Sequence, residues 1–88
     1  MDIVKTKIPK IIDVRAIGPL ELLIVYDDKQ KKTFNVAPYI KLFKAFEPLL
    51  DEKTFKQVHT NRLGDALIWN ENIDISGYDV WEVGSSLS

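Results

Sequence analysis

Residues 64–76 constrain the fold of this chain more than any other stretch, and they read Gly-Asp-Ala-Leu-Ile-Trp-Asn-Glu-Asn-Ile-Asp-Ile-Ser. The Gly-Asp pair that opens the stretch is a turn signal. Ala66–Trp69 is a short apolar run with the bulk of a buried strand. Polar Asn70–Asn72 ends that run, and Asp74 and Ser76 each offer an N-cap for a final helix. The stretch therefore predicts a turn, a strand, a second turn and the start of a helix.

The N-terminal part of the chain predicts antiparallel strands. Lys10–Ile17 alternates polar and apolar residues with period two, Gly18-Pro19 is a turn signal, and Leu20–Tyr26 is the most apolar run. The polar stretch Asp27–Lys32 links this run to Thr33–Val36, so we expect a hairpin. The side of the first strand that is expected to face the core holds Ile12, Val14 and Ala16.

Three short helices are expected beyond these strands. Pro38–Phe46 has apolar residues at three- and four-residue spacing and begins with a proline, which the first turn of a helix tolerates. Pro48 should end that helix, and Asp51 can cap a second helix over Glu52–Lys56. A last helix is expected over Gly77–Val83.

A second hairpin is expected from Gln57–Arg62 and Ala66–Trp69, with Trp69 in the core. These elements together predict an α+β fold, with a mostly antiparallel sheet of about five strands and two or three short helices packed on it. The chain has 88 residues, which is the length of one domain. We therefore predict a single domain over 1–88, with flexible ends at 1–8 and 85–88.

Composition argues against several classes of protein. The chain has no cysteine, so we expect neither a disulfide nor a thiolate-bound metal. No apolar run approaches the roughly 18 residues of a membrane span, and the first residues lack the apolar segment of a signal peptide. We therefore expect a cytoplasmic protein that does not associate with a membrane. The formal net charge of −1 at pH 7 argues against a dedicated nucleic-acid-binding protein.

Four pieces of the chain carry a family resemblance through their order and spacing. They are Leu20–Asp28 leading into Thr33–Val36, then Phe46–Asp51, then Phe55–Val58, and last Ile68-Trp69 followed by Ile73–Ile75. They resemble the small bacterial family called domain of unknown function 2442, over most of the chain. That family usually has a glycine in the first hairpin turn, where this chain has Lys29-Gln30-Lys31-Lys32. The resemblance implies an antitoxin-like protein, the partner of another small protein in a toxin–antitoxin-type operon.

The residue types that could carry catalysis do not come together in the sequence. His59 is the only histidine, and no nucleophile or carboxylate stands at a spacing that would make it a general base. Asp65, Glu71 and Asp74 lack the alternation and the glycine of a calcium loop, so we assign them to caps and turns. No glycine-rich phosphate loop is present. We therefore expect no enzyme activity, no cofactor and no metal.

Two non-catalytic functions remain open. The first is a protein–protein interaction module, the antitoxin-like role that the resemblance implies. The alternative is a nucleic-acid-binding transcriptional regulator that uses the lysine-rich hairpin Lys29-Gln30-Lys31-Lys32, with Lys41 and Lys44, to hold phosphates. No aromatic residue stands between the hairpin lysines and no arginine offers a bidentate contact to bases. We therefore do not expect this chain to bind nucleic acid alone.

The C-terminal third of the chain carries the candidate partner-binding residues. Residues 57–88 have a net charge of −4, against +3 for residues 1–56. The expected last helix places two aromatic residues on one face beside acidic residues, and aromatic anchors with a charged rim are common at interfaces. The expected partner is therefore a small basic protein. The candidate partner-binding residues are Glu71, Tyr78, Asp79, Trp81 and Glu82.

Self-association is the other expectation for the partner. Leu20–Tyr26 is apolar on both faces, which is typical of a central strand. The helices expected over Pro38–Phe46 and Gly77–Val83 can cover only one of these faces, because a chain this short has little material. The other face would then need a second chain to cover Leu23 and Val25 together with Ile11 and Ile17.

Overall fold

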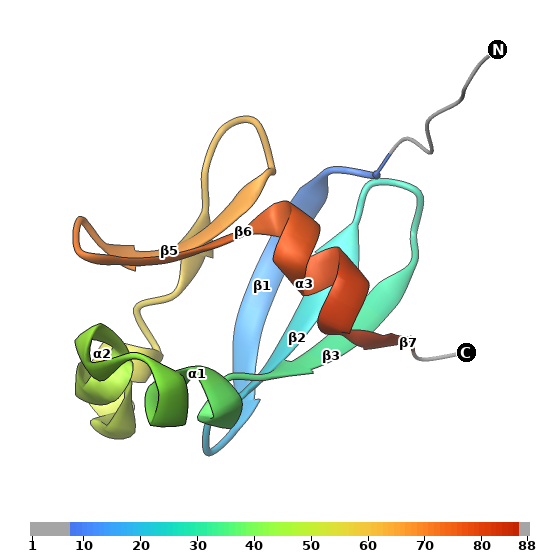
Figure 1. Ribbon diagram of the computed structural model, residues 1–88. Coiled ribbons are helices and arrows are strands. Elements are labelled where there is room, and N and C mark those ends of the chain that lie inside the picture. Colours follow the sequence, from blue (N-terminus) through green and yellow to red (C-terminus); the bar gives the residue numbers. More distant parts are fainter. Residues whose placement is uncertain (1–7, 87–88) are drawn as a thin grey trace, which may run out of the picture.

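The computed structural model describes residues 8–86, so residues 1–7 and 87–88 of the expected flexible ends lie outside the described residues. The expectation of a flexible end is wrong for Ser85–Ser86, because these residues form a strand that pairs with Lys32 and Thr33. The chain is α+β, as predicted. The expected single sheet of about five strands is wrong, because the strands form two antiparallel sheets (Figure 1). The first sheet, in the order β1-β2-β3-β7, contains β1 (Ile11–Gly18), β2 (Glu21–Tyr26), β3 (Lys31–Asn35) and β7 (Ser85–Ser86). The second sheet contains β4 (His59–Thr60), β5 (Ala66–Asn70) and β6 (Ile73–Ser76).

Strand β6, like the short β7, was not predicted from the sequence. Ile73 and Ile75 are buried while Asp74 and Ser76 are exposed, which is the alternation of a half-buried strand. β6 pairs antiparallel with β5, and the turn between them is held by the Asn72 N–H, which donates to the Asn70 side chain at 2.8 Å. Strand β5 therefore pairs with β4 on one side, as predicted, and with β6 on the other.

The chain between the two sheets is helical. It contains α1 (Ala37–Leu42), the 3₁₀ helix η1 (Lys44–Leu50) and α2 (Glu52–Phe55), and a further helix, α3 (Gly77–Val83), follows β6. The expected single helix over Pro38–Phe46 is wrong because Phe43 is extended, with φ −129° and ψ 115°. Pro48 lies inside η1 rather than at a helix end. Asp51 and Ser76 are caps, as predicted, since their side chains each accept a backbone N–H at 3.1 Å. Asp74, the other residue offered as a cap of the last helix, lies instead within β6.

A register shift in β1 changes which of its residues face the core. The pairing of β1 with β2 is irregular between Ile11 and Asp13, and such a bulge re-aims the side chains around it. Ile11 is buried and Ile12 is 59% exposed, so the prediction that Ile12 faces the core is wrong. Ile11 belongs to the core and not to the outer face, where self-association was expected to cover it.

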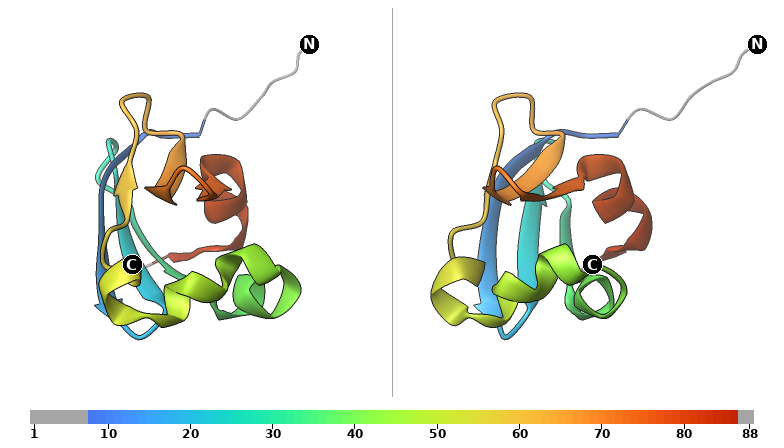
Figure 2. Two further views of the ribbon diagram at one scale, coloured as in Figure 1. Left: turned by 90° about the vertical axis from the view of Figure 1, so that its left-hand side faces the viewer. Right: turned by 60° about the vertical axis from the view of Figure 1, so that its left-hand side comes forward.

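The core lies between the two sheets. The period of a strand puts Leu22, Ile24 and Tyr26 on the face of β2 opposite to Leu23 and Val25, and these three residues are fully buried. Trp69 is 2% exposed, packs on Phe55 with ring centroids 6.3 Å apart, and donates its indole N–H to the Phe55 carbonyl at 3.0 Å. Its predicted place in the core is therefore confirmed. In the views of Figure 2, the second sheet and α3 lie over the same face of the first sheet.

Helix α3 connects the outer strand of the second sheet to the outer strand of the first. It follows β6 directly and leads into β7, which pairs with Lys32 and Thr33 of β3. The Gly77 N–H donates to the Asp65 carbonyl at 2.7 Å, and a Cβ atom at Gly77 would lie only 2.7 Å from the same oxygen. The backbone can approach this closely only because residue 77 is glycine. Within residues 8–86, no helix is long and apolar enough to cross a membrane.

Candidate partner-binding surface

Helix α3 has an inner and an outer face. Gly77 and Val80 are buried, and Trp81 packs against the core. The outer face, which we call the acidic face, consists of Tyr78, Asp79, Glu82 and Val83. All of its side chains are exposed, with Tyr78 at 59% and Val83 at 61%. Glu82 lies four residues after Tyr78 and Val83 four residues after Asp79, so these two pairs run side by side along the outer side of the helix.

Trp81 does not share this exposed face. Its ring meets the ring of Tyr26 edge-on, with centroids 5.1 Å apart and an interplanar angle of 84°. The Lys32 ammonium lies 3.9 Å from the centroid of the Trp81 ring and donates to the Trp81 carbonyl. Such cation–π contacts are stronger where the cation is desolvated. Trp81 therefore fastens α3 to the first sheet, and Tyr78 is the aromatic residue of α3 that projects outward.

Glu71 lies apart from the other candidate residues. It stands in the turn between β5 and β6, while α3 begins at the far end of β6 (Figure 1). Four residues of β6 separate the turn from the helix, a distance of roughly 13 Å at the rise of a strand. The structure therefore brings Tyr78, Asp79 and Glu82 together, and it places Glu71 at a separate corner of the molecule.

The lysines of the alternative reading do not form one surface. Lys32 is only 8% exposed and is engaged by Trp81, so it is not free to hold a phosphate. Lys29 and Lys31 are exposed near the β2–β3 turn. Lys41 and Lys44 lie at the opposite end of the molecule, in α1 and η1 (Figure 1). The sequence could not separate Lys32 from its neighbours, because its burial depends on α3.

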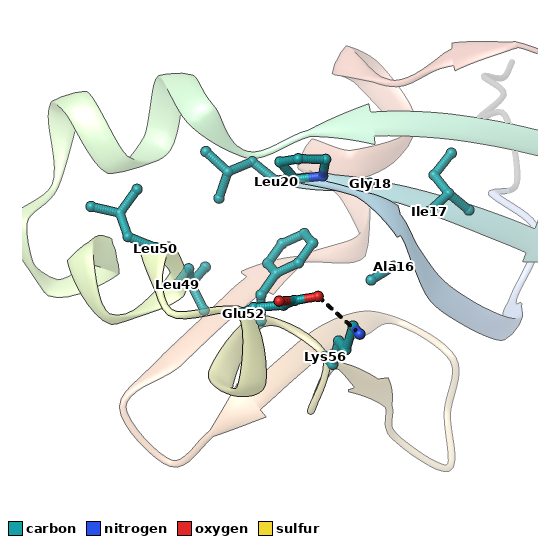
Figure 3. Close-up of a pocket in the computed structure, with 10 residues that line it drawn as sticks. Ala16, Ile17, Gly18, Leu20, Leu49, Leu50, Glu52 and Lys56 are labelled. Carbon is teal, nitrogen blue, oxygen red and sulfur yellow. Dashed lines mark ion pairs between the residues drawn. The ribbon is translucent and has the colours of Figure 1, made fainter.

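An apolar hollow of about 480 Å³ lies between the β1–β2 turn and the segment that joins η1 to α2. Leu49 and Phe55 line it and are nearly fully buried. Ile17 and Leu50 line it from the exposed side, with exposed fractions of 50% and 65%. Figure 3 shows Leu20 and Leu50 near this space, with Glu52 and Lys56 joined as an ion pair beside it. The sequence analysis did not identify this hollow.

The one sequence feature that points to this hollow is the pair of adjacent leucines in η1. Leu49 and Leu50 are consecutive, so they cannot both point into the core from a short helix. Leu49 takes the core position, and Leu50 is left exposed at the edge of the hollow. Exposed apolar side chains that gather around a concave surface are typical of a binding site.

A second hollow, of about 330 Å³, lies beside Tyr78. Leu63, which is 62% exposed, and Tyr26 also line it. The Tyr26 hydroxyl is buried and has no hydrogen-bond partner among the described residues. Burial, and then the charge of Asp28, raise the pKa of Tyr26 to about 12. This hydroxyl is therefore neutral at physiological pH.

The acidic face lies close enough to α1 to act on it electrostatically. Burial raises the pKa of Tyr39 above its ordinary value, and the charge of Asp79 raises it further. Tyr39 belongs to α1 and Asp79 to α3, so the two helices lie on one side of the molecule, as Figure 2 also shows. The acidic face and the α1–η1 segment therefore lie toward the same side of the molecule (Figure 2).

The remaining polar candidates have structural surroundings. His59 is exposed, and its Nδ1 lies 3.0 Å from the Gln57 carbonyl oxygen. Asp65 accepts the Asn61 side-chain N–H in a turn. Within the described part of the chain, no three His, Cys, Asp or Glu residues come together as metal ligands.

One comparison with known proteins identifies a family. The family described as "Protein of unknown function (DUF2442)" matches residues 11–81. The chain belongs to the DUF2442 family. No curated protein and no solved structure matches it significantly.

The DUF2442 match covers both sheets apart from β7, and most of α3. Ile68-Trp69 and Ile73–Ile75 lie on the neighbouring strands β5 and β6, where Ile68 pairs with Asp74. In the first hairpin turn, Lys29 has a φ of 76°, a conformation that favours glycine. The match ends at Trp81, so two residues of the acidic face, Glu82 and Val83, lie just beyond it.

Proposed function

We propose that this domain is a non-catalytic protein–protein interaction module, the antitoxin-like partner of a small basic protein in a bacterial toxin–antitoxin-type pair. The observation that carries the proposal is the apolar hollow at the β1–β2 turn. Its exposed side chains, Ile17 and Leu50, offer hydrocarbon that water would leave when a partner side chain enters, and the buried Leu49 and Phe55 line the space between them.

The charge of α3 supports a basic partner. Asp79 and Glu82 are exposed beside Tyr78, and within residues 8–86 neither carboxylate forms an ion pair. Exposed charges of one sign attract an oppositely charged protein and raise its rate of association. A toxin that cleaves RNA must be basic to hold its substrate, so an acidic surface on the masking protein suits such a partner.

The nucleic-acid-binding alternative has weaker support. The burial of Lys32 removes one of its hairpin lysines, and the remaining lysines lie at two ends of the molecule. Phosphate binding gains from several cations that follow one backbone path. A regulator of this kind would therefore need its partner to complete the nucleic-acid surface.

The test uses the protein encoded by the adjacent gene as the probe. The two purified proteins are mixed and their association is followed by stopped flow and light scattering. We expect a complex whose association slows when Asp79 and Glu82 are both changed to Lys. This effect should fade at 1 M salt, where the Debye length falls to about 3 Å.

A matched pair of variants tests the hollow. Leu50→Glu should speed dissociation of the complex at least about tenfold, because a charge would be buried in an apolar contact. Ile12→Glu is the control, since Ile12 is 59% exposed and lines neither this hollow nor the one beside Tyr78. If the adjacent protein forms no complex with the parent domain, the antitoxin-like role is wrong. Equal effects of the two substitutions would exclude the hollow as the docking site.

A further inference from the structure

A basic and apolar surface lies where α1 meets η1. We call it the basic junction, and it consists of Lys41, Leu42, Phe43 and Lys44. All of these residues are exposed, with Leu42 at 74% and Phe43 at 51%. Exposed apolar side chains are common singly, but here two stand together between two cations. The acidic face of α3 has the same composition with the opposite sign of charge.

Phe43 is held in place although half of it is exposed. Its extended backbone breaks the helix, and its ring packs against Tyr39 and Phe46 with centroid distances of 6.2 Å and 6.0 Å. A ring held by other rings loses little side-chain entropy when it is covered. Phe43 is therefore a preorganised apolar anchor for something that binds at the junction.

The charges of the two surfaces form no ion pairs with one another or with other side chains of residues 8–86. Across residues 8–86 the ion pairs are Arg15–Asp13 and Lys56–Glu52. Lys41 and Lys44 of the basic junction, and Asp79 and Glu82 of the acidic face, take part in neither pair. Each surface thus presents two like charges and two large apolar side chains to a binding partner.

The two surfaces also lie on the same side of the molecule. The Tyr39 side chain of α1 is within the electrostatic reach of Asp79 on α3, and both helices lie on one side in Figure 2. In a dimer with a two-fold axis, each contact occurs twice. If the basic junction of one copy meets the acidic face of the second copy, the basic junction of the second copy must also meet the acidic face of the first. Two complementary surfaces on one side satisfy this requirement, whereas surfaces on opposite sides would build an open chain of molecules.

We propose that a second copy of this chain binds here, with the basic junction of each copy on the acidic face of the other. In this two-fold dimer, Lys41 and Lys44 pair with the partner copy's acidic side chains, and Leu42 and Phe43 pack on its exposed apolar ones. The inference goes beyond the proposed function, because it concerns the chain without any other protein. It also uses a different surface of the molecule from the outer sheet face on which self-association was expected.

The expected affinity of this dimer is modest. Each copy contributes eight residues, four from the junction and four from the acidic face, against about 20–30 residues a side in a standard interface. We therefore expect a dissociation constant on the order of micromolar to tens of micromolar at low salt. Screening of four exposed charge pairs should weaken it roughly tenfold at 1 M salt.

The test is sedimentation equilibrium of the purified chain alone, up to about 0.5 mM. The parent should approach twice the monomer mass of 10.1 kDa at low salt. Lys41→Glu with Lys44→Glu gives two acidic surfaces, and Asp79→Lys with Glu82→Lys gives two basic ones. Each double variant should remain a monomer, because like charges then face each other. An equimolar mixture of the two variants should recover the dimer, since every contact is again between opposite charges.

A control separates the surface from net charge. Lys10→Glu with Lys31→Glu changes the net charge by the same amount at exposed lysines outside the junction, and it should dimerise like the parent. Thermal unfolding of each variant checks that it is folded. A parent that stays at the monomer mass up to 0.5 mM overturns the proposal. A dimer that survives both double substitutions, or a mixture that does not re-associate, overturns it as well.

Discussion

Truncation of Trp69 gives the most direct test of the core. Trp69→Ala removes a large ring that is 2% exposed and packed on Phe55, and such truncations cost about 3–5 kcal/mol. It also leaves the Phe55 carbonyl without its indole donor, which lies at 3.0 Å, at a further cost of about 1 kcal/mol or more. A domain of 88 residues has a total stability of only about 4–13 kcal/mol. The substitution should therefore remove much or all of it.

Urea denaturation measures this loss, and Trp81 remains as a fluorescent probe. With a slope of about 1 kcal/mol per molar urea for a small domain, Trp69→Ala should lower the midpoint by about 3 M or abolish folding. Trp69→Phe keeps most of the ring but loses the donor, so it should lie between Trp69→Ala and the parent. Leu42→Ala is the control, because Leu42 is 74% exposed. If Trp69→Ala and Leu42→Ala shift the midpoint equally, the placement of β5 in the core is wrong.

Four further perturbations follow from single contacts. Gly77→Ala should cost about 2 kcal/mol or more in thermal unfolding, because its Cβ would lie 2.7 Å from backbone, whereas Gly18→Ala meets nothing within 4 Å and should be neutral. Lys29→Gly should raise the melting temperature, because Lys29 has a left-handed backbone conformation that costs a non-glycine residue about 1 kcal/mol. Folding raises the pKa of Tyr26 from 10.0 to about 12. The free energy of unfolding that depends on its neutral hydroxyl is therefore complete below pH 10 and is lost as the pH rises toward 12. In unfolding curves recorded at alkaline pH, Tyr26→Phe should not show this loss. Lys32→Met should lower the free energy of unfolding by about 1–2 kcal/mol, because the cation and the donor to Trp81 are lost; an unchanged urea midpoint would contradict this.

The features of the fold that could be predicted from the sequence depend mostly on local patterns. The inner row of Leu22, Ile24 and Tyr26 follows from the period of a strand. Asp51 and Ser76 could be recognised as caps because a cap acts only on the next turn of its own helix. These features depend on neighbours within a few residues, so a single sequence is enough to find them.

The features that could not be predicted depend on distant parts of the chain. Ile73–Ser76 contains two residues typical of caps, and only its pairing with β5 makes it a strand. Ile12 points outward because the pairing of β1 with β2 shifts register beside it. Its neighbour Ile11 donates its backbone N–H to the Gly64 carbonyl at 2.8 Å. In the candidate surface, Tyr78, Asp79 and Glu82 could be grouped by helix periodicity. The hollow beside Leu50 could not, because two segments that are far apart in the sequence line it.

Because Lys32 is buried, the reactivity of its amine reports how often α3 detaches from the first sheet. Its amine lies under the Trp81 ring, so an acylating reagent can reach it only when α3 lifts from the first sheet. Lys31 precedes it on the same strand and is exposed, so it reacts without any opening. The ratio of the two acylation rates, read from one proteolytic peptide, gives the equilibrium constant for detachment of the C-terminal helix. Such a measurement needs no engineered label, and it would register any partner that holds α3 down.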